Sequence, residues 1–462
     1  ASVYFPADVA GATTVAQVSN VQANYPLVVC VHGQSDIETG YLGYNYLLDH
    51  LARNGFICAS IYCADGMYVV GRARLLQRHL QILFSRFGAR VANNVGIMGH
   101  SRGGEAVMHA AKLNHTEAWG YNLNAVISLA PTDWILGDSL VGAWAPRVLI
   151  MYGSLDGDVA GIQDTGFELY DRASGMKKSM AFIYGACHDR FNTEWGDADL
   201  TEPWSKLGPT DVARVISPNA HQVIAKGYMA AFFRQCLRNE TQWEGIFKGE
   251  WVPAAATAST PNLRIYVQYE DTTVRTVDDF EGAHTAMSWA TSTINDTVSQ
   301  TGLVANPAEQ QLYPNDSLSP HDTGGLRLRW NSFADALQWN LPAGQRNVTS
   351  YTALSFRITQ IAGSMDNPAN QPQDLRVTLT DGTSTARAIR VSKFAEVPYP
   401  DVREWSSLTK SALRTIRIPL SAYTIRCLGV PEVNLTDVRS IRFEFDEKPA
   451  GEIAVDSIQF TN

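Results

Sequence analysis

The chain has little that would suit it to nucleic acid or to a membrane. It holds 37 Lys and Arg against 46 Asp and Glu, which gives a net charge of −9 over 462 residues, and no run of basic residues stands out. Without a basic patch there is nothing to neutralise a row of phosphates or an anionic lipid surface. No apolar stretch reaches the roughly 20 residues that span a bilayer. We therefore expect neither a nucleic acid nor a membrane as a partner.

Cysteine is also scarce, and its six positions show no zinc-like spacing. Cys30, Cys58 and Cys63 lie in or beside apolar runs, where a thiol behaves as a small core side chain. A disulfide between Cys187 and Cys236 is one option, because it would tie a loop to the last helix of the first half. We therefore expect no metal centre held by cysteine.

The sequence has no internal repeat, and its length exceeds one ordinary domain. Residues 1–252 alternate continuous apolar runs with helical stretches, which predicts a doubly wound, mostly parallel α/β sheet buried on both faces. Residues 253–272 combine small residues and prolines without periodicity, as a linker does. Residues 273–462 alternate apolar and polar positions between clusters of Gly, Asn, Asp and Pro, which predicts an all-β antiparallel sandwich.

One stretch of the first half carries a chemical signature. Residues 99–103 read Gly-His-Ser-Arg-Gly, between a strand-like apolar run at 95–98 and a helical stretch at 105–113. A serine on a tight strand-to-helix turn has strained backbone angles, which lift its hydroxyl clear of the sheet. It also lies at a helix N-terminus, where free N–H groups favour negative charge. These features predict Ser101 as a nucleophile.

A serine hydroxyl needs a base to take its proton and an acid to orient that base. In sites of this kind the acid and then the base follow the serine along the chain, each after its own strand. Asp156 follows one apolar run and His188 follows the next. Neighbouring parallel strand ends lie about 5 Å apart, so the three side chains can converge. We predict Asp156 as the acid and His188 as the base, with Asp158 and Asp133 as rival acids.

The anionic intermediate of acyl transfer needs two N–H donors. One is expected from Arg102, directly after the nucleophile. The other is expected from the loop after the strand-like run at 26–31, where Gln34 is the first candidate and Ser35 the second.

Together, residues 32–33 (His-Gly), the turn at 99–103, the Gly-x-x-Asp at 153–156 and the His188 loop resemble the α/β-hydrolase superfamily over about residues 1–250. Within it, the chain is most similar to the compact branch of cutinase-type polyester hydrolases, chlorophyllases and platelet-activating-factor acetylhydrolases. The resemblance implies a carboxylic-ester hydrolase that passes through an acyl-enzyme.

The segment between the strand-like runs at 125–129 and 147–152 is too short for a large lid domain. We therefore expect an open cleft that admits bulky or polymeric esters. Its rim is expected to carry aromatic side chains that pack the apolar part of a substrate. The candidates are Tyr41, Trp134, Phe191 and Trp195.

The two ends of the second half, residues 276–281 and 453–460, resemble galactose-binding-like jelly rolls, including carbohydrate-binding modules. Members of that group often hold a structural calcium ion near the termini. The resemblance implies Asp278, Glu281 and Asp456 as its ligands here.

These observations predict a monomeric serine esterase that needs no cofactor for catalysis. A peptidase or amidase with the same triad is the second hypothesis, and a polymer-binding protein with a degenerate catalytic half is the third. A cofactor-free haloperoxidase is a remote alternative, and a haloalkane dehalogenase is disfavoured because its nucleophile would be an aspartate at position 101. The chain begins at Ala1 without a methionine. That start suits a secreted protein trimmed of a signal peptide, or one chosen for expression.

Overall fold

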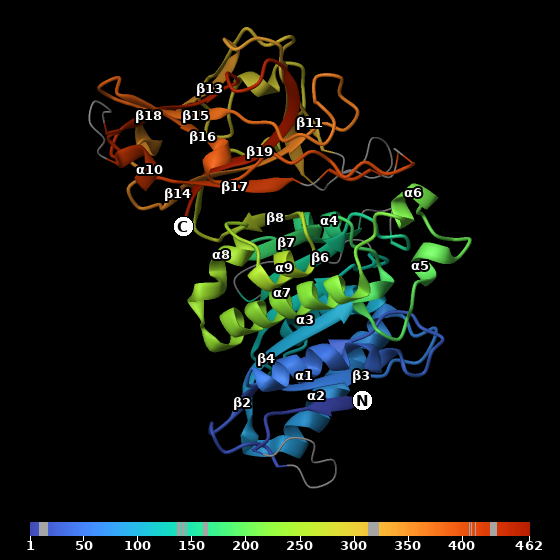
Figure 1. The fold of residues 1–462 in the computed structure, drawn as a ribbon. Coiled ribbons are helices and arrows are strands. Elements are labelled where there is room, and N and C mark those ends of the chain that lie inside the picture. The colour runs from blue at the N-terminus through green and yellow to red at the C-terminus, as the bar shows by residue number, and fades with distance from the viewer. Residues whose placement is uncertain are drawn as a thin grey trace. The chain divides into compact units, whose positions relative to one another are not determined.

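The structure is a computed structural model, and it describes residues 1–8, 17–135, 140, 144, 146–159, 165–312, 323–405, 407, 409–411, 413–425 and 432–462. The chain forms two compact units (Figure 1). The first comprises Ala1–Phe247, Trp251–Ile265 and Arg403–Trp405, and the second comprises Lys248–Glu250, Tyr266–Val402 and Ser406–Asn462. No helix in the described part of the chain is long and apolar enough to cross a bilayer.

The first sheet has eight strands in the order β1-β3-β2-β4-β5-β6-β7-β8. These are β1 (Ser2–Tyr4), β2 (Tyr25–Val31), β3 (Ile57–Ile61), β4 (Val91–His100), β5 (Leu123–Leu129), β6 (Arg147–Gly153), β7 (Lys178–Ile183) and β8 (Ile265–Glu270). The pairs from β3 through β7 are parallel, whereas β1 pairs antiparallel with β3. Every residue of β2, β3 and β7 is buried, as expected of apolar strands covered on both faces. The ends of β4, β6 and β7 therefore lie at one edge of the sheet.

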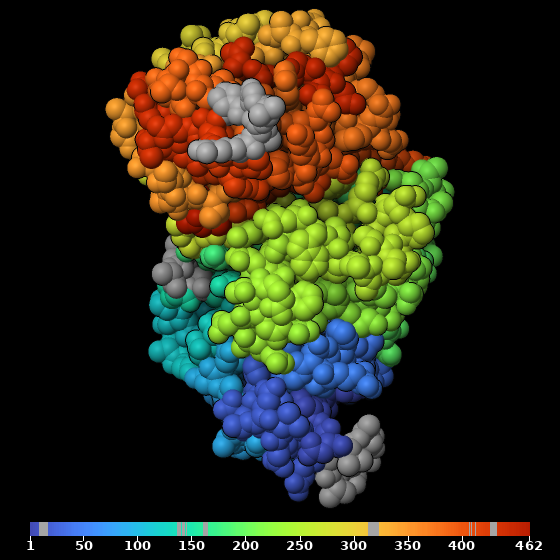
Figure 2. All heavy atoms as spheres, turned by 60° about the vertical axis from the view of Figure 1, so that its left-hand side comes forward, coloured from blue at the N-terminus to red at the C-terminus, as the bar shows by residue number. Residues whose placement is uncertain are grey.

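Helices pack beside these strands (Figure 1). The helices of this unit are α1 (Asn45–Arg53), α2 (Val69–Phe87), α3 (Arg102–Thr116), α4 (Thr165–Arg172), α5 (Ala198–Thr201), α6 (Pro209–Val212), α7 (Pro218–Arg238), α8 (Glu244–Phe247) and α9 (Ala254–Ser259). Of these, α1, α2, α3, α4, α7 and α8 contact strands of the sheet. Helix α1 contacts α7, and on the face shown in Figure 2 blue N-terminal residues adjoin the yellow-green residues around α7. Helix α2 contacts α3, which itself contacts β4 and β5. The nucleophile turn is thus bounded by a buried strand and a packed helix.

The second unit contains two sheets of antiparallel strands. The five-stranded sheet has the order β10-β13-β18-β15-β16, and the other has the order β11-β12-β19-β14-β17 with β9 paired to β19. The strands are β9 (Val274–Asp278), β10 (Val298–Thr301), β11 (Ala308–Gln311), β12 (Gly324–Trp330), β13 (Ala336–Asn340), β14 (Ala353–Gln360), β15 (Arg376–Asp381), β16 (Ala386–Arg390), β17 (Arg414–Pro419), β18 (Val438–Glu444) and β19 (Gly451–Thr461). One short helix, α10 (Ser421–Thr424), follows β17.

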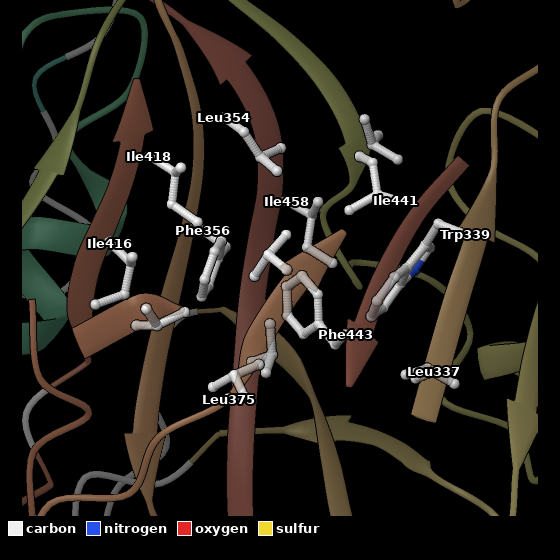
Figure 3. Packing of buried hydrophobic residues seen from close by; sticks show 14 of the residues in the cluster. Leu337, Trp339, Leu354, Phe356, Leu375, Ile416, Ile418, Ile441, Phe443 and Ile458 are labelled. Atoms are coloured by element: carbon white, nitrogen blue, oxygen red, sulfur yellow. The ribbon is translucent and has the colours of Figure 1, made fainter. Parts of the chain in front are cut away.

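The apolar core of the second unit joins its two sheets. In Figure 3, Phe356 of β14 and Phe443 of β18 face one another, and their ring centroids are 4.8 Å apart. Trp339 of β13 lies 5.0 Å from Phe443 and donates its indole N–H to Asp278 at 2.9 Å. All three aromatic side chains are fully buried. Interlocking aromatic rings of this size account for much of the stability of such a core.

The predicted fold class, a doubly wound and mostly parallel α/β-hydrolase sheet followed by an antiparallel jelly roll, is wrong. Strand content is 30% and helix content 28%. Among the described residues, parallel pairs occur only in the eight-stranded sheet, which is itself mixed, and the strands of the other two sheets pair antiparallel. Hydrophobic periodicity reports how a strand is buried but not the direction of its partner. The three-residue β1 is too short to show any period in the sequence.

The region predicted as a linker, 253–272, also differs from the expectation. It contains α9 and β8, since its alanine run has high helix propensity and Ile265–Glu270 is mostly apolar or β-branched. A second difference lies in the first unit, which includes Arg403–Trp405 from late in the chain. There the Glu404 carboxylate accepts hydrogen bonds from the backbone N–H (2.9 Å) and hydroxyl (2.7 Å) of Thr210.

Candidate active site

The nucleophile turn joins β4 directly to α3. Ser101 lies between them with φ 56° and ψ −126°, a strained conformation for a residue with a side chain. A Cβ at Gly99 would lie 1.9 Å from the Gly103 carbonyl oxygen, and one at Gly103 would lie 2.2 Å from the Val31 carbonyl oxygen. Only glycine fits at both positions, because strand, turn and helix pass at backbone contact. The two glycines therefore allow the turn that presents Ser101.

Asp156 and His188 meet at the ends of β6 and β7. The Nδ1 atom of His188 lies 2.8 Å from Oδ2 of Asp156, and both side chains are buried. The other carboxylate oxygen of Asp156 accepts the backbone N–H groups of Asp158 (2.9 Å) and Val159 (2.8 Å). This division of the two oxygens fixes the carboxylate against Nδ1 of His188. His188 and Ser101 line the same cleft.

The Nε2 atom of His188 has no hydrogen-bond partner among the residues that the structure describes. The nearest carboxylate oxygen on that side is Oδ2 of Asp158, at 3.6 Å. Catalytic hydrogen bonds of an empty site are often long and shorten when substrate binds. The free acceptor position on Nε2 is where a serine proton would be received.

The two rival acids lie differently. Asp133 is fully buried and forms an ion pair with Arg172 of α4. Asp158 approaches Nε2 rather than Nδ1 and is about half exposed. A carboxylate on Nε2 can stabilise the protonated ring but cannot orient it for a reaction at that same nitrogen.

The charge around His188 shifts its proton affinity. Burial disfavours the imidazolium form, but the charge of Asp156, its hydrogen bond, and the charges of Asp158 and Asp189 outweigh burial. They hold the pKa of His188 above its ordinary value. The His188 imidazole therefore loses its proton at a higher pH than an isolated histidine does.

The loop that carries His188 is held by two buried side chains that the sequence analysis missed. Oδ2 of Asp199 accepts the backbone N–H of His188 at 2.6 Å, and Nε2 of His221 accepts that of Cys187 at 3.0 Å. Burial and the nearby charge of Asp189 raise the pKa of Asp199 to about 7. Burial lowers the pKa of His221 to about 4, so this ring is neutral and can accept. Cys187 and Cys236 are both free thiols, so the disulfide considered above is absent.

The loop after β2 passes directly over the nucleophile. A Cβ at Gly33 would lie 2.6 Å from Cβ of Ser101, so only glycine lets the backbone come this close. Gln34, next along the chain, lines the cleft beside Ser101 and Arg102. The Arg102 N–H is the first of α3 and has no acceptor within the helix. Both predicted oxyanion donors thus belong to residues that line the same cleft as Ser101.

The cleft in front of Ser101 and His188 has a volume of about 550 Å³. Of the four predicted aromatic residues, Trp134 and Trp195 line it. Trp134 is 51% exposed, which leaves an indole face open to a ligand. The Trp195 ring lies parallel to that of His188, with planes 9° apart and centroids 6.1 Å apart, and it is closer to the His100 ring, at 4.6 Å.

The other two aromatic candidates do not line the cleft. Phe191 is fully buried and packs edge-on against His221 at a centroid distance of 4.7 Å. Tyr41 packs against Tyr62 at 6.0 Å. Both residues lie in short 3₁₀ helices, Tyr41 in Gly40–Tyr44 and Phe191 in Asp189–Phe191. Aromatic side chains both support sites from below and line them, so residue type alone does not separate the two. Trp204 lines the cleft and is 46% exposed, although sequence reasoning did not single it out.

Glu105, one turn into α3, is a second structural residue that sequence reasoning missed. Its buried carboxylate accepts the backbone N–H groups of Trp134 (2.7 Å) and Ile135 (2.6 Å) and the hydroxyl of Thr132 (2.7 Å). Burial raises the pKa of this carboxyl above its ordinary value. The side chain ties the Trp134 loop to the nucleophile helix.

Replacing Glu105 should therefore destabilise the first unit. Glu105→Ala leaves the buried Thr132 hydroxyl and the part-buried N–H groups of Trp134 and Ile135 without their acceptor, and we expect it to lower the free energy of unfolding by about 2–4 kcal/mol. Glu105→Gln keeps an oxygen for the two N–H groups and should lose about 1 kcal/mol. Urea unfolding followed by tryptophan fluorescence measures both. An alanine variant as stable as the parent would show that the loop does not depend on this carboxylate.

No group of three or more His, Cys, Asp or Glu within the described ranges is arranged to hold a metal ion. The three predicted calcium ligands have protein partners. Asp456 pairs with the guanidinium of Arg357, Asp278 accepts the indole N–H of Trp339, and Glu281 accepts the hydroxyl of Thr323 at 2.7 Å. A cation already neutralises Asp456, so these residues do not fit a calcium site.

No protein-family model matches this chain, and comparison with curated proteins gives no match. The argument about function therefore rests on the geometry of the site.

Proposed function

We propose that the protein is a serine carboxylic-ester hydrolase. The observation that carries the proposal is the pairing of a strained, glycine-flanked Ser101 with a buried Asp156–His188 hydrogen bond of 2.8 Å on the same cleft. A strained serine backbone and a buried acid–imidazole pair each cost free energy of folding, so stability by itself does not account for them. Their meeting at one cleft is the arrangement that activates a hydroxyl.

In the proposed reaction, Ser101 attacks the ester carbonyl while Nε2 of His188 takes its proton. Asp156 stabilises the imidazolium that forms and keeps the proton of Nδ1 in place. The N–H groups of Arg102 and Gln34 bind the negatively charged oxygen of the tetrahedral intermediate. The imidazolium then protonates the leaving alcohol, and an acyl-enzyme remains. His188 next deprotonates a water molecule, whose attack releases the acid and restores Ser101.

Bulky or polymeric esters are the proposed substrates. The cleft of about 550 Å³ is bordered by Trp134 and Trp204, each about half exposed. Open indole faces bind planar or apolar groups along an extended chain. A polymeric ester can lie across such a rim, whereas an enclosed pocket would admit only its end.

Active-site labelling combined with a substrate pair tests the proposal. A fluorophosphonate probe should label Ser101 stoichiometrically, as identified by peptide mass spectrometry, because only an activated serine reacts. A p-nitrophenyl ester should be hydrolysed at least about 10³-fold faster than the matched p-nitroanilide. Equal rates on ester and anilide would favour an amidase, and failure to label would point to a binding protein. Heat-unfolded protein is the control for non-specific labelling.

A further inference from the structure

The Arg102 side chain has no part in the proposed reaction, which uses only its backbone N–H. Its guanidinium nevertheless makes two specific contacts at the cleft. Nη1 donates a hydrogen bond to Oε1 of Gln34 at 2.7 Å, and the guanidinium lies 4.1 Å from the centre of the Trp134 ring. The Arg102 side chain thus contacts both the loop after β2, through Gln34, and the Trp134 ring at the edge of the cleft.

Gln34 is held from a second direction by Arg72 of α2. This arginine is fully buried and donates to the carbonyl oxygens of His32 at 2.8 Å and Met67 at 2.9 Å. Its Nη2 lies 3.5 Å from the same Oε1 atom of Gln34 that Arg102 contacts. The His32 ring completes the support, because its Nε2 accepts the backbone N–H of Cys63 at 2.8 Å.

These contacts converge on three consecutive residues, 32–34. Gly33 offers no side chain for support, and its backbone lies against Ser101. A glycine-containing loop has many accessible conformations. The position of an N–H donor on such a loop is therefore poorly defined unless neighbouring residues are held in place. Oxyanion stabilisation depends on donors that are already in place when charge develops. The loop needs external restraint, and Gln34 is the residue that receives it.

We infer that the Arg102 side chain is a positioning residue for the oxyanion hole: by binding the Gln34 amide oxygen together with Arg72, it fixes the Gln34 N–H over Ser101. The residue after the nucleophile then contributes to both halves of the hole, with its own N–H on one side and its guanidinium on the other. This inference rests on the proposed esterase function.

A double-mutant cycle tests the inference with p-nitrophenyl acetate, a substrate too small to need the Trp134 wall. Arg102→Met and Gln34→Met each remove one side of the contact and retain side-chain bulk. Each should lower kcat about 10- to 100-fold with KM changed less than about 3-fold, since the lost interaction serves the transition state. The double variant should be no slower than the slower single variant, because both act through one contact.

A transition-state analogue separates positioning from general disruption. An alkyl boronic acid forms a tetrahedral anion on the serine, so its Ki should rise by the same factor as kcat/KM falls. Arg74→Met, on α2 two residues from Arg72 and in an exposed pair with Glu117, is the matched control and should leave kcat unchanged. Arg102→Lys should recover part of the rate.

Three results would overturn the inference. They are an unchanged kcat in Arg102→Met, additive losses in the double variant, and a loss confined to KM. In each case the parent protein still hydrolyses esters and still reacts with a fluorophosphonate, so the proposed function stands. Absence of both activities in the parent would instead refute the proposed function itself.

Discussion

Ser101→Ala should abolish ester hydrolysis, with kcat/KM lowered by about 10⁴-fold or more. In the proposed mechanism the substitution removes the atom that forms the acyl-enzyme, and residues 99–103 hold no other hydroxyl that could replace it. The backbone at φ 56° is no less favourable for Ala than for Ser. Folding should therefore be unaffected, and the melting temperature should stay within about 2 °C of the parent. Initial rates with p-nitrophenyl esters measure the loss.

The matched control is Ser35→Ala, on the loop after β2, which removes a half-buried cleft hydroxyl that accepts the backbone N–H of Ile37 and leaves the backbone N–H of residue 35 and the proposed triad in place. It should retain the parent rate within about 3-fold. Substantial esterase activity in a properly folded Ser101→Ala protein would contradict the proposed mechanism. Labelling that persists in that variant would place the nucleophile elsewhere.

Asp156→Asn should lower kcat/KM by about 10³- to 10⁴-fold at neutral pH. The amide can still accept the N–H groups of Asp158 and Val159 through Oδ1. Its NH₂ group would face Nδ1 of His188 and force the hydrogen onto Nε2. The ring then presents a donor to Ser101 and cannot take its proton. The geometry stays intact while the base is disabled.

Asp158→Asn distinguishes the effect of the Asp158 carboxylate on His188 from that of the Asp156 carboxylate. It removes a negative charge 3.6 Å from Nε2 of His188, one of the charges that raise the pKa of that ring. Only the neutral imidazole is a base, so activity rises with pH through the pKa of His188. Lowering that pKa should move the acid limb of the kcat/KM profile down by about one pH unit. At alkaline pH the variant should match the parent within a few-fold.

These two variants distinguish the acid of the triad. If Asp158→Asn loses 10³-fold and Asp156→Asn does not, the acid is Asp158. If the acid limb does not move in Asp158→Asn, the Asp158 charge does not reach the base. A pH profile between 5 and 10 with a small, uncharged ester resolves both cases.

The positions of the candidate triad followed from chain order and from the apolar runs that precede each residue. A buried strand can be predicted from sequence because a continuous apolar run is typical of a strand covered on both faces. A polar residue directly after such a run is then expected at the edge of the sheet. The residues that support the site could not be predicted from the sequence. Asp199, His221 and Glu105 act through hydrogen bonds to backbone groups that lie 11, 34 and 29 positions away in the sequence. Nothing in their local sequence separates them from surface residues.

The same limit explains the errors. Phe191 and Trp195 lie four residues apart on one loop, yet one packs inward and the other lines the cleft. Their direction depends on what the loop meets, here His221 and His188. The antiparallel pairing of β1 was not predicted for the same reason. A three-residue strand has no recognisable sequence pattern, and its direction is set by its pairing with β3.

The sequence by itself determined the local chemistry of this protein. It placed a serine between two glycines on a strand-to-helix turn, and an acid and a histidine after later strands. These features can be predicted because local sterics and the burial pattern of a strand depend on consecutive residues. Tertiary structure alone decided which carboxylate faces Nδ1 of His188, which indoles border the cleft, and that Arg102 and Arg72 meet on Gln34. Those contacts join segments dozens of residues apart. Their geometry depends on how helices and loops pack, which no local pattern specifies.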